Sequence, residues 1–116
     1  MAMVSWFKDL LKEDLSGVTF VRDYVQLQFN PHPTLNIYTP ITVTSDGAKR
    51  RSGEPEFANA LIGQINKWVN DVTIEPGKSI SVHFRDGSVI SFSTQPEDVA
   101  QEAFTFLTKE GGIYEE

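Results

Sequence analysis

The sequence has no cysteine, only two histidines and no long run of apolar residues. Without cysteine the chain can form no disulfide scaffold, zinc ribbon or iron–sulfur site, and it carries no thiol nucleophile. No segment approaches the roughly 18 consecutive apolar residues that a membrane-spanning helix needs. The N-terminal apolar stretch is broken at Lys8 and Asp9, too soon for the core of a signal peptide. We therefore expect a cytoplasmic protein that does not bind membranes.

Basic residues are also scarce, because 10 Lys and Arg stand against 16 Asp and Glu and give a net charge of −6. Most of this charge lies in residues 97–116, which hold six acids and one base. Such a region disfavours nucleic acid and suits a basic surface on a partner protein. The basic cluster at residues 49–51 lies among turn-forming residues, and we expect a flexible loop over residues 45–55.

The length and the apolar content predict a single domain over residues 1–116, with 40% hydrophobic residues and eight phenylalanines to supply its core. Residues 18–29 alternate between apolar and polar around a tight turn at Arg22-Asp23, which indicates two strands. Residues 35–44 resume this alternation, and the interruption at Pro40 fits a bulge or an edge position.

Residues 72–94 give the strongest strand signal in the sequence. Turns at Pro76-Gly77 and Asp86-Gly87 separate three alternating segments, which predicts a three-stranded meander. Ile80, Val82 and Phe84 should share one face of this meander and His83 the other, because side chains alternate along a strand.

Helical periodicity is found in two segments. Residues 4–14 carry apolar side chains at helical spacing, and so do residues 56–69, which predicts a helix in each segment. Gly63 interrupts the second stripe, and the alternative there is a helix that ends near Ile62, followed by a strand through Val69. After Pro96 we expect one helical turn followed by a strand. The expected fold is therefore α+β, with an antiparallel sheet of about six strands in hairpin repeats and two helices on one face.

The two halves of the sequence show a weak internal similarity. A Leu-x-Gly triplet at residues 15–17 or 61–63 precedes a strand that ends in phenylalanine, and a proline follows in each half at Pro40 or Pro96. Two duplicated hairpin units that join in one sheet would explain this pattern, and chance similarity between hairpins would explain it equally well.

No established catalytic or metal-binding motif is present. The spacings H-x-H, H-x-x-E and D-x-D are absent, as are G-x-S-x-G, the P-loop and G-x-G-x-x-G, so we expect no enzymatic activity, no metal and no cofactor. A helical face could hold Glu97, Asp98 and Glu102, although a solvated helix start explains these acids better. The residues most suited to partner binding are acidic or amphipathic ones, namely Glu97, Asp98, Glu102, Glu110, Tyr24, Tyr38 and His83.

Several motifs together resemble a family of small uncharacterised bacterial α+β proteins. The shared pattern is L-x-G-Q, F-x-D-G-S, P-E-D and E-A, which this sequence carries at residues 61–64, 84–88, 96–98 and 102–103. The resemblance covers roughly residues 15–106 and implies no established activity. Small acidic bacterial proteins of this build include immunity proteins that neutralise toxins, which is an analogy at the level of size and charge.

Two functions follow as hypotheses. The first is a non-enzymatic protein-interaction module, similar in role to an immunity protein, that acts through a sheet face or the acidic C-terminal region. The second is a small-molecule-binding protein or an enzyme without a familiar motif. Its pocket would lie between helices and sheet, with His83, Tyr24, Tyr38 and Arg85 as the polar groups to examine. A homo-oligomer is compatible with either hypothesis.

Overall fold

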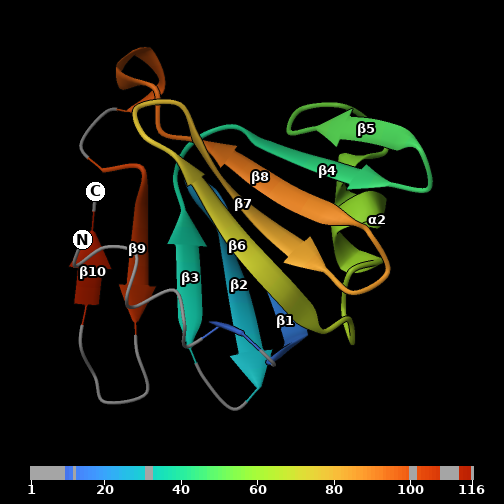
Figure 1. The fold of residues 1–116 in the computed structure, drawn as a ribbon. Coiled ribbons are helices and arrows are strands. Elements are labelled where there is room, and N and C mark those ends of the chain that lie inside the picture. The colour runs from blue at the N-terminus through green and yellow to red at the C-terminus, as the bar shows by residue number, and fades with distance from the viewer. Residues whose placement is uncertain (1–9, 12, 31–32, 100–101, 108–112, 116) are drawn as a thin grey trace.

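The computed structural model describes residues 10–11, 13–30, 33–99, 102–107 and 113–115, and their strands form two antiparallel sheets (Figure 1). Sheet A contains, in spatial order, β1 (Asp14–Val21), β2 (Tyr24–Asn30), β3 (Thr34–Ile37), β9 (Phe104–Leu107) and β10 (Ile113–Glu115). Sheet B contains, in spatial order, β5 (Ala48–Arg51), β4 (Ile41–Ser45), β8 (Val89–Ser93), β7 (Ser79–Phe84) and β6 (Val69–Glu75).

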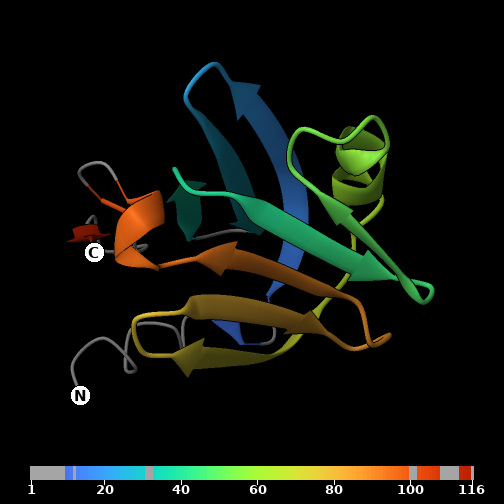
Figure 2. The same cartoon turned by 90° about the horizontal axis from the view of Figure 1, so that it is seen from above.

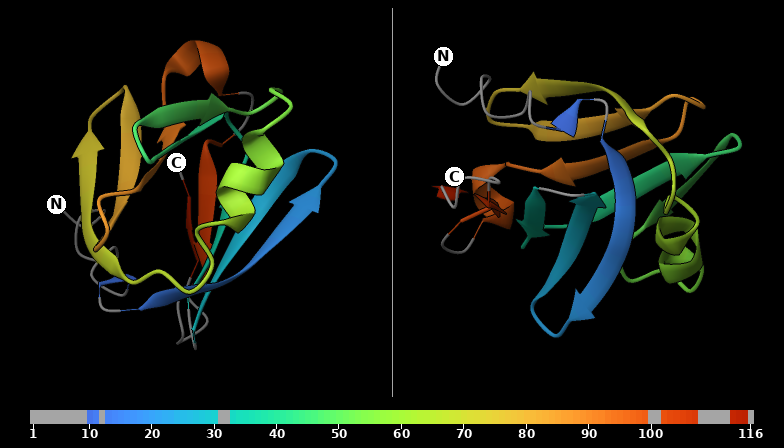
Figure 3. Two further views of the ribbon diagram at one scale, coloured as in Figure 1. Left: turned by 90° about the vertical axis from the view of Figure 1, so that its right-hand side faces the viewer. Right: turned by 90° about the horizontal axis from the view of Figure 1, so that it is seen from below.

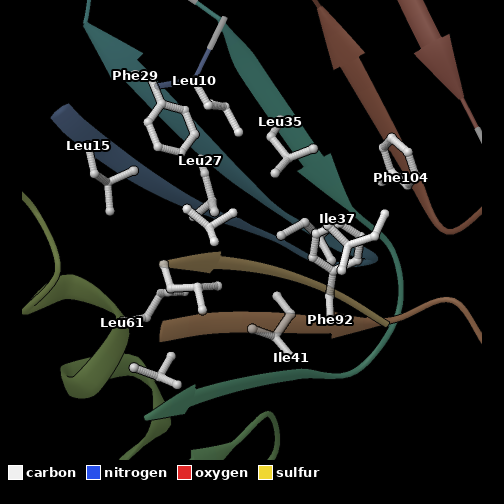
Figure 4. Packing of buried hydrophobic residues seen from close by; sticks show 14 of the residues in the cluster. Leu10, Leu15, Leu27, Phe29, Leu35, Ile37, Ile41, Leu61, Phe92 and Phe104 are labelled. Atoms are coloured by element: carbon white, nitrogen blue, oxygen red, sulfur yellow. The ribbon is translucent and has the colours of Figure 1, made fainter. Parts of the chain in front are cut away.

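The core lies between the two sheets, whose strands cross when the molecule is seen from above (Figure 2). Alternate residues of β3, β4, β7, β8 and β9, and of the second half of β2, are buried, and these residues are all aliphatic or phenylalanine. The rings of Phe92 in sheet B and Phe104 in sheet A meet edge to face at 5.6 Å (Figure 4). Contacts of this kind bury both sheets against one another and leave their polar faces outside.

The expected α+β class is wrong, because the described residues are mostly strand and hold a single α-helix, α2 (Phe57–Ile62). The second predicted helix is thus much shorter than residues 56–69. It ends at Ile62, as the alternative interpretation of that segment predicted. The strand that this alternative placed between Ile62 and Val69 is wrong, because residues 63–66 form turns and β6 begins at Val69. The sheet of about six strands is also wrong, since the strands divide into two sheets of five.

The first predicted helix, residues 4–14, falls largely outside the described residues. Within them, the Glu13 N–H donates to the Leu10 carbonyl in a single turn, and Asp14 already belongs to β1. The C-terminal end of that predicted helix is therefore wrong. The short helical turn predicted after Pro96 is confirmed as the 3₁₀-helix η2 (Pro96–Asp98), and the strand predicted after it is confirmed as β9.

The loop predicted over residues 45–55 is in part a hairpin. Residues Ala48–Arg51 form β5, which pairs with β4 across the turn at Asp46 and Gly47. Both turn residues have positive φ, 53° for Asp46 and 77° for Gly47, as a type I′ turn requires. The same Asp-Gly signal that predicted the β7–β8 turn was therefore also present here.

Other strand predictions are confirmed. The turn at Arg22 and Asp23 joins β1 to β2, and β6, β7 and β8 form the predicted meander. Pro40 does not mark a bulge, because it lies between β3 and β4, where the chain crosses from sheet A to sheet B. Proline cannot donate to a ladder, which suits a residue that leaves one sheet to enter the other.

The two sheets are built from a structural repeat, which we define as the first repeat (residues 10–51) and the second repeat (residues 64–115). Each repeat supplies three strands of one sheet, β1–β2–β3 or β6–β7–β8, and then a hairpin, β4–β5 or β9–β10, to the other sheet. Each hairpin joins the third strand of the opposite repeat. The repeats are thus related by a pseudo-two-fold axis and exchange their hairpins.

The hydrogen bonds confirm this relation residue by residue. The Leu15 N–H donates to the Lys67 carbonyl at 3.0 Å, and the Val69 N–H donates to the Glu13 carbonyl at 2.9 Å, so that Leu15 corresponds to Val69. Both first strands carry a bulge at this place, opposite Phe29 or Phe84. Identical register and an identical bulge in two hairpins are difficult to explain by chance, and they support duplication.

The structure also corrects the alignment of the halves. Leu15 lies on β1 and Leu61 on α2, so the two Leu-x-Gly triplets do not correspond. By contrast, the predicted match of Phe29 with Phe84 follows the repeat. The two prolines do not correspond, because the Tyr38 N–H donates to the Ala103 carbonyl and the Ser93 N–H to the Pro40 carbonyl, which makes Ala103 the counterpart of Pro40. The hairpin units do not join in one sheet, because the β4–β5 and β9–β10 hairpins are exchanged between two sheets.

Candidate functional site

A cavity of about 460 Å³ lies where α2 covers the β4–β5 hairpin, and we call it the α2 cavity. Helix α2 contacts β1, β4 and β5, and it stands beside these strands in Figure 3. The lining residues come from β4, the turn after it, β5, α2 and the segment that follows α2: Val43, Ser45, Asp46, Ala48, Arg50, Asn59, Ala60, Gly63, Gln64 and Lys67.

The local sequence explains how this lining arises. Phe57 and Leu61 are one helical turn apart and are both buried, so they fix α2 on the core. After Ile62 the chain continues in turns, in which the Gln64 N–H donates to the Leu61 carbonyl and the Lys67 N–H to the Gln64 carbonyl. These turns direct Gln64 and Lys67 into the cavity.

Gln64 is the most unusual residue of the site, since it is only 2% exposed. Its Nε2 donates to the Ala60 carbonyl at 3.0 Å, but its Oε1 has no hydrogen-bond partner among the described residues. Such buried acceptors are uncommon, because an unpaired amide oxygen costs about 1–3 kcal/mol of desolvation. The turn that places Gln64 has a counterpart in the first repeat, where the Glu13 N–H donates to the carbonyl of Leu10. Gln64 thus corresponds to a fully buried leucine.

Lys67 brings a positive charge to the cavity. Its Nζ lies 2.8 Å from Asp86 Oδ2 and 3.0 Å from Ser88 Oγ. An ammonium group has three donors, so two are accounted for and the third is available to a ligand. Ser88 is nearly buried, and its hydroxyl also lies 3.3 Å from the Ser45 hydroxyl on the cavity wall.

The turn at Asp86 holds the lysine in place. The Lys67 ammonium and the Ser88 backbone N–H both hydrogen-bond the Asp86 carboxylate and lower its pKa from 3.8 to about 2. Asp86 therefore stays ionised at neutral pH. Arg50 adds a second cation to the lining and Asp46 an anion, so the cavity combines cationic donors with a buried neutral acceptor.

The amphipathic residues singled out from the sequence lie elsewhere. Tyr24 and Tyr38 are brought together on sheet A, with ring centroids 5.4 Å apart, and the Tyr38 hydroxyl lies 3.0 Å from Thr105 Oγ1. His83 is on β7 in sheet B, where its Nε2 lies 2.9 Å from Thr73 Oγ1. Arg85 stacks over the half-exposed ring of Trp68 at 5.4 Å. These four residues do not meet in one site, and none of them lines the α2 cavity.

The acidic residues form no single site either. Glu97 is exposed on η2, whereas the carboxylate of Asp98 accepts a hydrogen bond from the Ser93 hydroxyl. Glu102 is half-buried just before β9, and Glu110 lies outside the described residues. Among the described acids, Glu97 and Asp98 are therefore adjacent in sequence, and residues 99–101 separate them from Glu102. Residues 100 and 101 lie outside the described part of the chain.

The residues of the α2 cavity were missed at the level of sequence, but one signal was available. Gln64 and Gly63 belong to the L-x-G-Q motif, and Asp86 and Ser88 to F-x-D-G-S. Lys67 connects the two motifs in space through its bonds to Asp86 and Ser88. A glutamine within a stripe of apolar residues at helical spacing was the sign that a polar group would be buried there.

The part of the chain that the structure describes holds no candidate metal site and no candidate membrane-spanning helix. No group of three or more His, Cys, Asp or Glu side chains there is placed to hold a metal ion. No helix there has the length and apolar character to cross a membrane. Comparison of the chain with protein-family models, with curated proteins and with solved structures finds no match.

Proposed function

We propose that this protein is a non-enzymatic binding protein for a small carboxylate that carries an adjacent hydrogen-bond donor, such as an amino acid or a hydroxy acid. The observation that carries the proposal is the unpartnered Oε1 of Gln64, a residue of the α2 cavity lining. The oxygen itself is buried behind the cavity surface, so a ligand donor would reach it once the side-chain amide turns toward the cavity. An orphaned acceptor that costs stability is explained if a ligand donor satisfies it. An amine or hydroxyl group of the ligand would supply that donor.

The cations of the cavity support an anionic ligand. Lys67 keeps one ammonium donor available while Asp86 and Ser88 fix its position, so that little side-chain entropy is lost on binding. Arg50 lies on the same lining and can pair with a carboxylate. The volume of about 460 Å³ is within the range of small-molecule pockets.

A cytoplasmic location is part of this proposal, and the absence of cysteine is compatible with it.

The test is a thermal-shift screen of L-amino acids and short 2-hydroxy acids, followed by calorimetry on any hit. A ligand at tenfold its Kd should stabilise the protein by about 1.4 kcal/mol and raise its Tm by a few degrees. The substitutions Gln64→Leu and Lys67→Met should each abolish this shift. Lys49→Met is the matched control, because Lys49 is exposed and does not line the cavity. The proposal fails if no compound binds, or if Gln64→Leu binds as tightly as the wild type.

We also propose a second function, the protein-interaction module, which the charge distribution of the sequence supports. Residues 97–116 carry six of the 16 acids, and Glu97 is exposed. A basic partner should be retained on immobilised protein at low salt and released at high salt, because surface charges are screened. The double substitution of Glu97 and Glu102 by glutamine should weaken that retention. Equal retention by the variant would exclude the acidic region as the contact.

A further inference from the structure

A second cavity lies on the outer face of sheet B, at a place where the two repeats differ. Its volume is about 490 Å³, and its lining includes Thr42, Lys78, Ser79 and Ser93. Ser79 and Ser93 face one another across β7 and β8. We call this the serine cavity. It is separate from the α2 cavity, with which it shares no lining residue.

The repeat supplies a direct comparison for this site. The pair Val25–Ile37 of the first repeat corresponds to the pair Ile80–Phe92 of the second. At the next position along these strands, the first repeat has Tyr24 beside Tyr38 and the second has Ser79 beside Ser93. The tyrosine rings are in contact on sheet A. On sheet B the same positions carry two small side chains that line a cavity.

The polar partner of the tyrosine is also conserved between the repeats. On sheet A the Tyr38 hydroxyl lies 3.0 Å from Thr105 Oγ1 on β9. Ile37 pairs with Phe104 as Phe92 pairs with Ile41, so Thr105 corresponds to Thr42 on β4. Thr42 lines the serine cavity. The cavity therefore retains the hydroxyl that binds the phenol on sheet A.

The crossover between sheets forms one wall of this cavity. In the first repeat only residues 38–40 join β3 to β4, whereas residues 94–103 join β8 to β9 and include η2. The Ser93 hydroxyl donates to Asp98 of η2 and accepts from the Gln95 N–H, so that its bonding is satisfied within the wall. Lys78 lies beside Ser79, and Arg51 pairs in register with Thr42.

We propose that the serine cavity binds a small molecule with a 4-hydroxyphenyl ring and a carboxylate. The ring would lie where the second repeat lacks the tyrosines of the first, with its hydroxyl on Thr42 Oγ1. The carboxylate would pair with Lys78, whose ammonium makes one ion pair among the described residues, an exposed contact of 3.7 Å to Glu75. Arg51 contributes a second cation next to the phenol end.

The experiment titrates 4-hydroxyphenylacetate into the full chain and follows binding by calorimetry and by NMR shifts of residues around Ser93. Phenylacetate, which lacks the hydroxyl, and 4-methylphenol, which lacks the carboxylate, are the comparison probes. We expect a Kd on the order of 1 mM or tighter for the first probe, and binding at least about fivefold weaker for the other two.

Three variants test the site. Ser79→Tyr with Ser93→Tyr, which transfers the tyrosine pair, should weaken binding at least about tenfold. Thr42→Val keeps the shape of the side chain, and it should weaken 4-hydroxyphenylacetate about fivefold while leaving phenylacetate unchanged, which a merely structural defect would not do. Thr105→Val, the matched change on sheet A, should leave both affinities unchanged.

Failure of this proposal is distinguishable from failure of the ligand site proposed in the α2 cavity, because Gln64→Leu should not change the affinity for 4-hydroxyphenylacetate. Absence of saturable binding by the wild type would overturn the proposal. So would equal losses of both aryl carboxylates in Thr42→Val, or undiminished binding in the folded double-tyrosine variant.

Discussion

Replacing Gln64 by leucine should make the protein more stable while removing its proposed ligand binding. Gln64 is almost fully buried and its Oε1 is unpaired among the described residues, so the change deletes an uncompensated polar group. Leucine is also the residue at the corresponding position of the first repeat, Leu10, which is fully buried. A side chain of that kind is therefore compatible with this turn geometry.

The magnitude follows from three terms. Removing a buried acceptor without a partner gains about 1–3 kcal/mol, and losing the Nε2 bond to the Ala60 carbonyl costs about 0.5–1.5 kcal/mol. The leucine side chain adds apolar burial of similar size to the loss of that bond. The last two terms cancel, so we expect a net gain of about 1–3 kcal/mol in the free energy of unfolding, and a Tm higher by about 3–12 °C.

Urea unfolding at constant slope and calorimetric melting measure this change. Leu10→Gln is the matched control, because it introduces the same amide at the equivalent buried site and should destabilise by about 2–4 kcal/mol. If Gln64→Leu instead lowers the free energy of unfolding by more than about 1 kcal/mol, the amide is a structural element of the protein. The assignment of Gln64 to a ligand would then be refuted.

Three further predictions concern neighbouring features. Asp86→Asn should lower the free energy of unfolding by about 1 kcal/mol at pH 7, which is less than the pKa difference alone implies because Asp86 is half-exposed. The stability that Asp86 contributes is present above about pH 4 and should vanish as the pH falls through about 2. Urea titrations at several pH values measure it. Leu61→Ala should cost about 2–5 kcal/mol in urea unfolding, whereas Ile62→Ala, on the exposed face of α2, should stay within about 0.5 kcal/mol. Tyr38→Phe should cost about 1 kcal/mol by loss of the bond to Thr105, and a double-mutant cycle with Thr105→Val should recover that energy as coupling.

The strands that were predicted correctly are those whose signal is local. Alternation of apolar residues around Asp86-Gly87 or Arg22-Asp23 requires only neighbouring residues to form a hairpin, and both hairpins are present. The division into two sheets depends on which strands pair across long distances in the sequence. β3 pairs with β9 and β4 with β8, and no local pattern determines those partners.

The helical content was overestimated for a related reason. An apolar stripe from Phe57 to Trp68 fits a helix, but after Ile62 the chain tightens into turns, and the left-handed Asn66, with φ of 80°, directs it away from the helix axis. The stripe continues because the turns after α2 also pack on the core, as partly buried Ile65 shows. The apolar periodicity of this segment therefore predicts which residues are buried, but it does not predict where the helix ends.

The candidate sites were harder to predict than the fold, because the groups that form them are ordinary residues. Tyr24, Tyr38 and His83 have the chemistry typical of binding sites, yet Tyr24 packs against Tyr38, and Tyr38 and His83 hydrogen-bond threonines of their own sheets. Ser79 and Ser93 carry no sequence signal of a binding site, and the signal for Gln64 is only its place within an apolar stripe. They become informative only when the repeat shows which residues stand at the equivalent positions.

Both cavities lie where the second repeat departs from the first, and this gives the two proposals a common test. Shared register, bulges and hydrogen bonds preserve the scaffold, whereas Leu10 is replaced by Gln64 and the tyrosine pair by Ser79 and Ser93. If these departures were neutral drift, restoring the residues of the first repeat would leave every binding property unchanged. If they are functional, each restoration should remove one ligand and leave the other, with stability maintained or increased, because a site that binds a ligand gives up some packing of the folded protein.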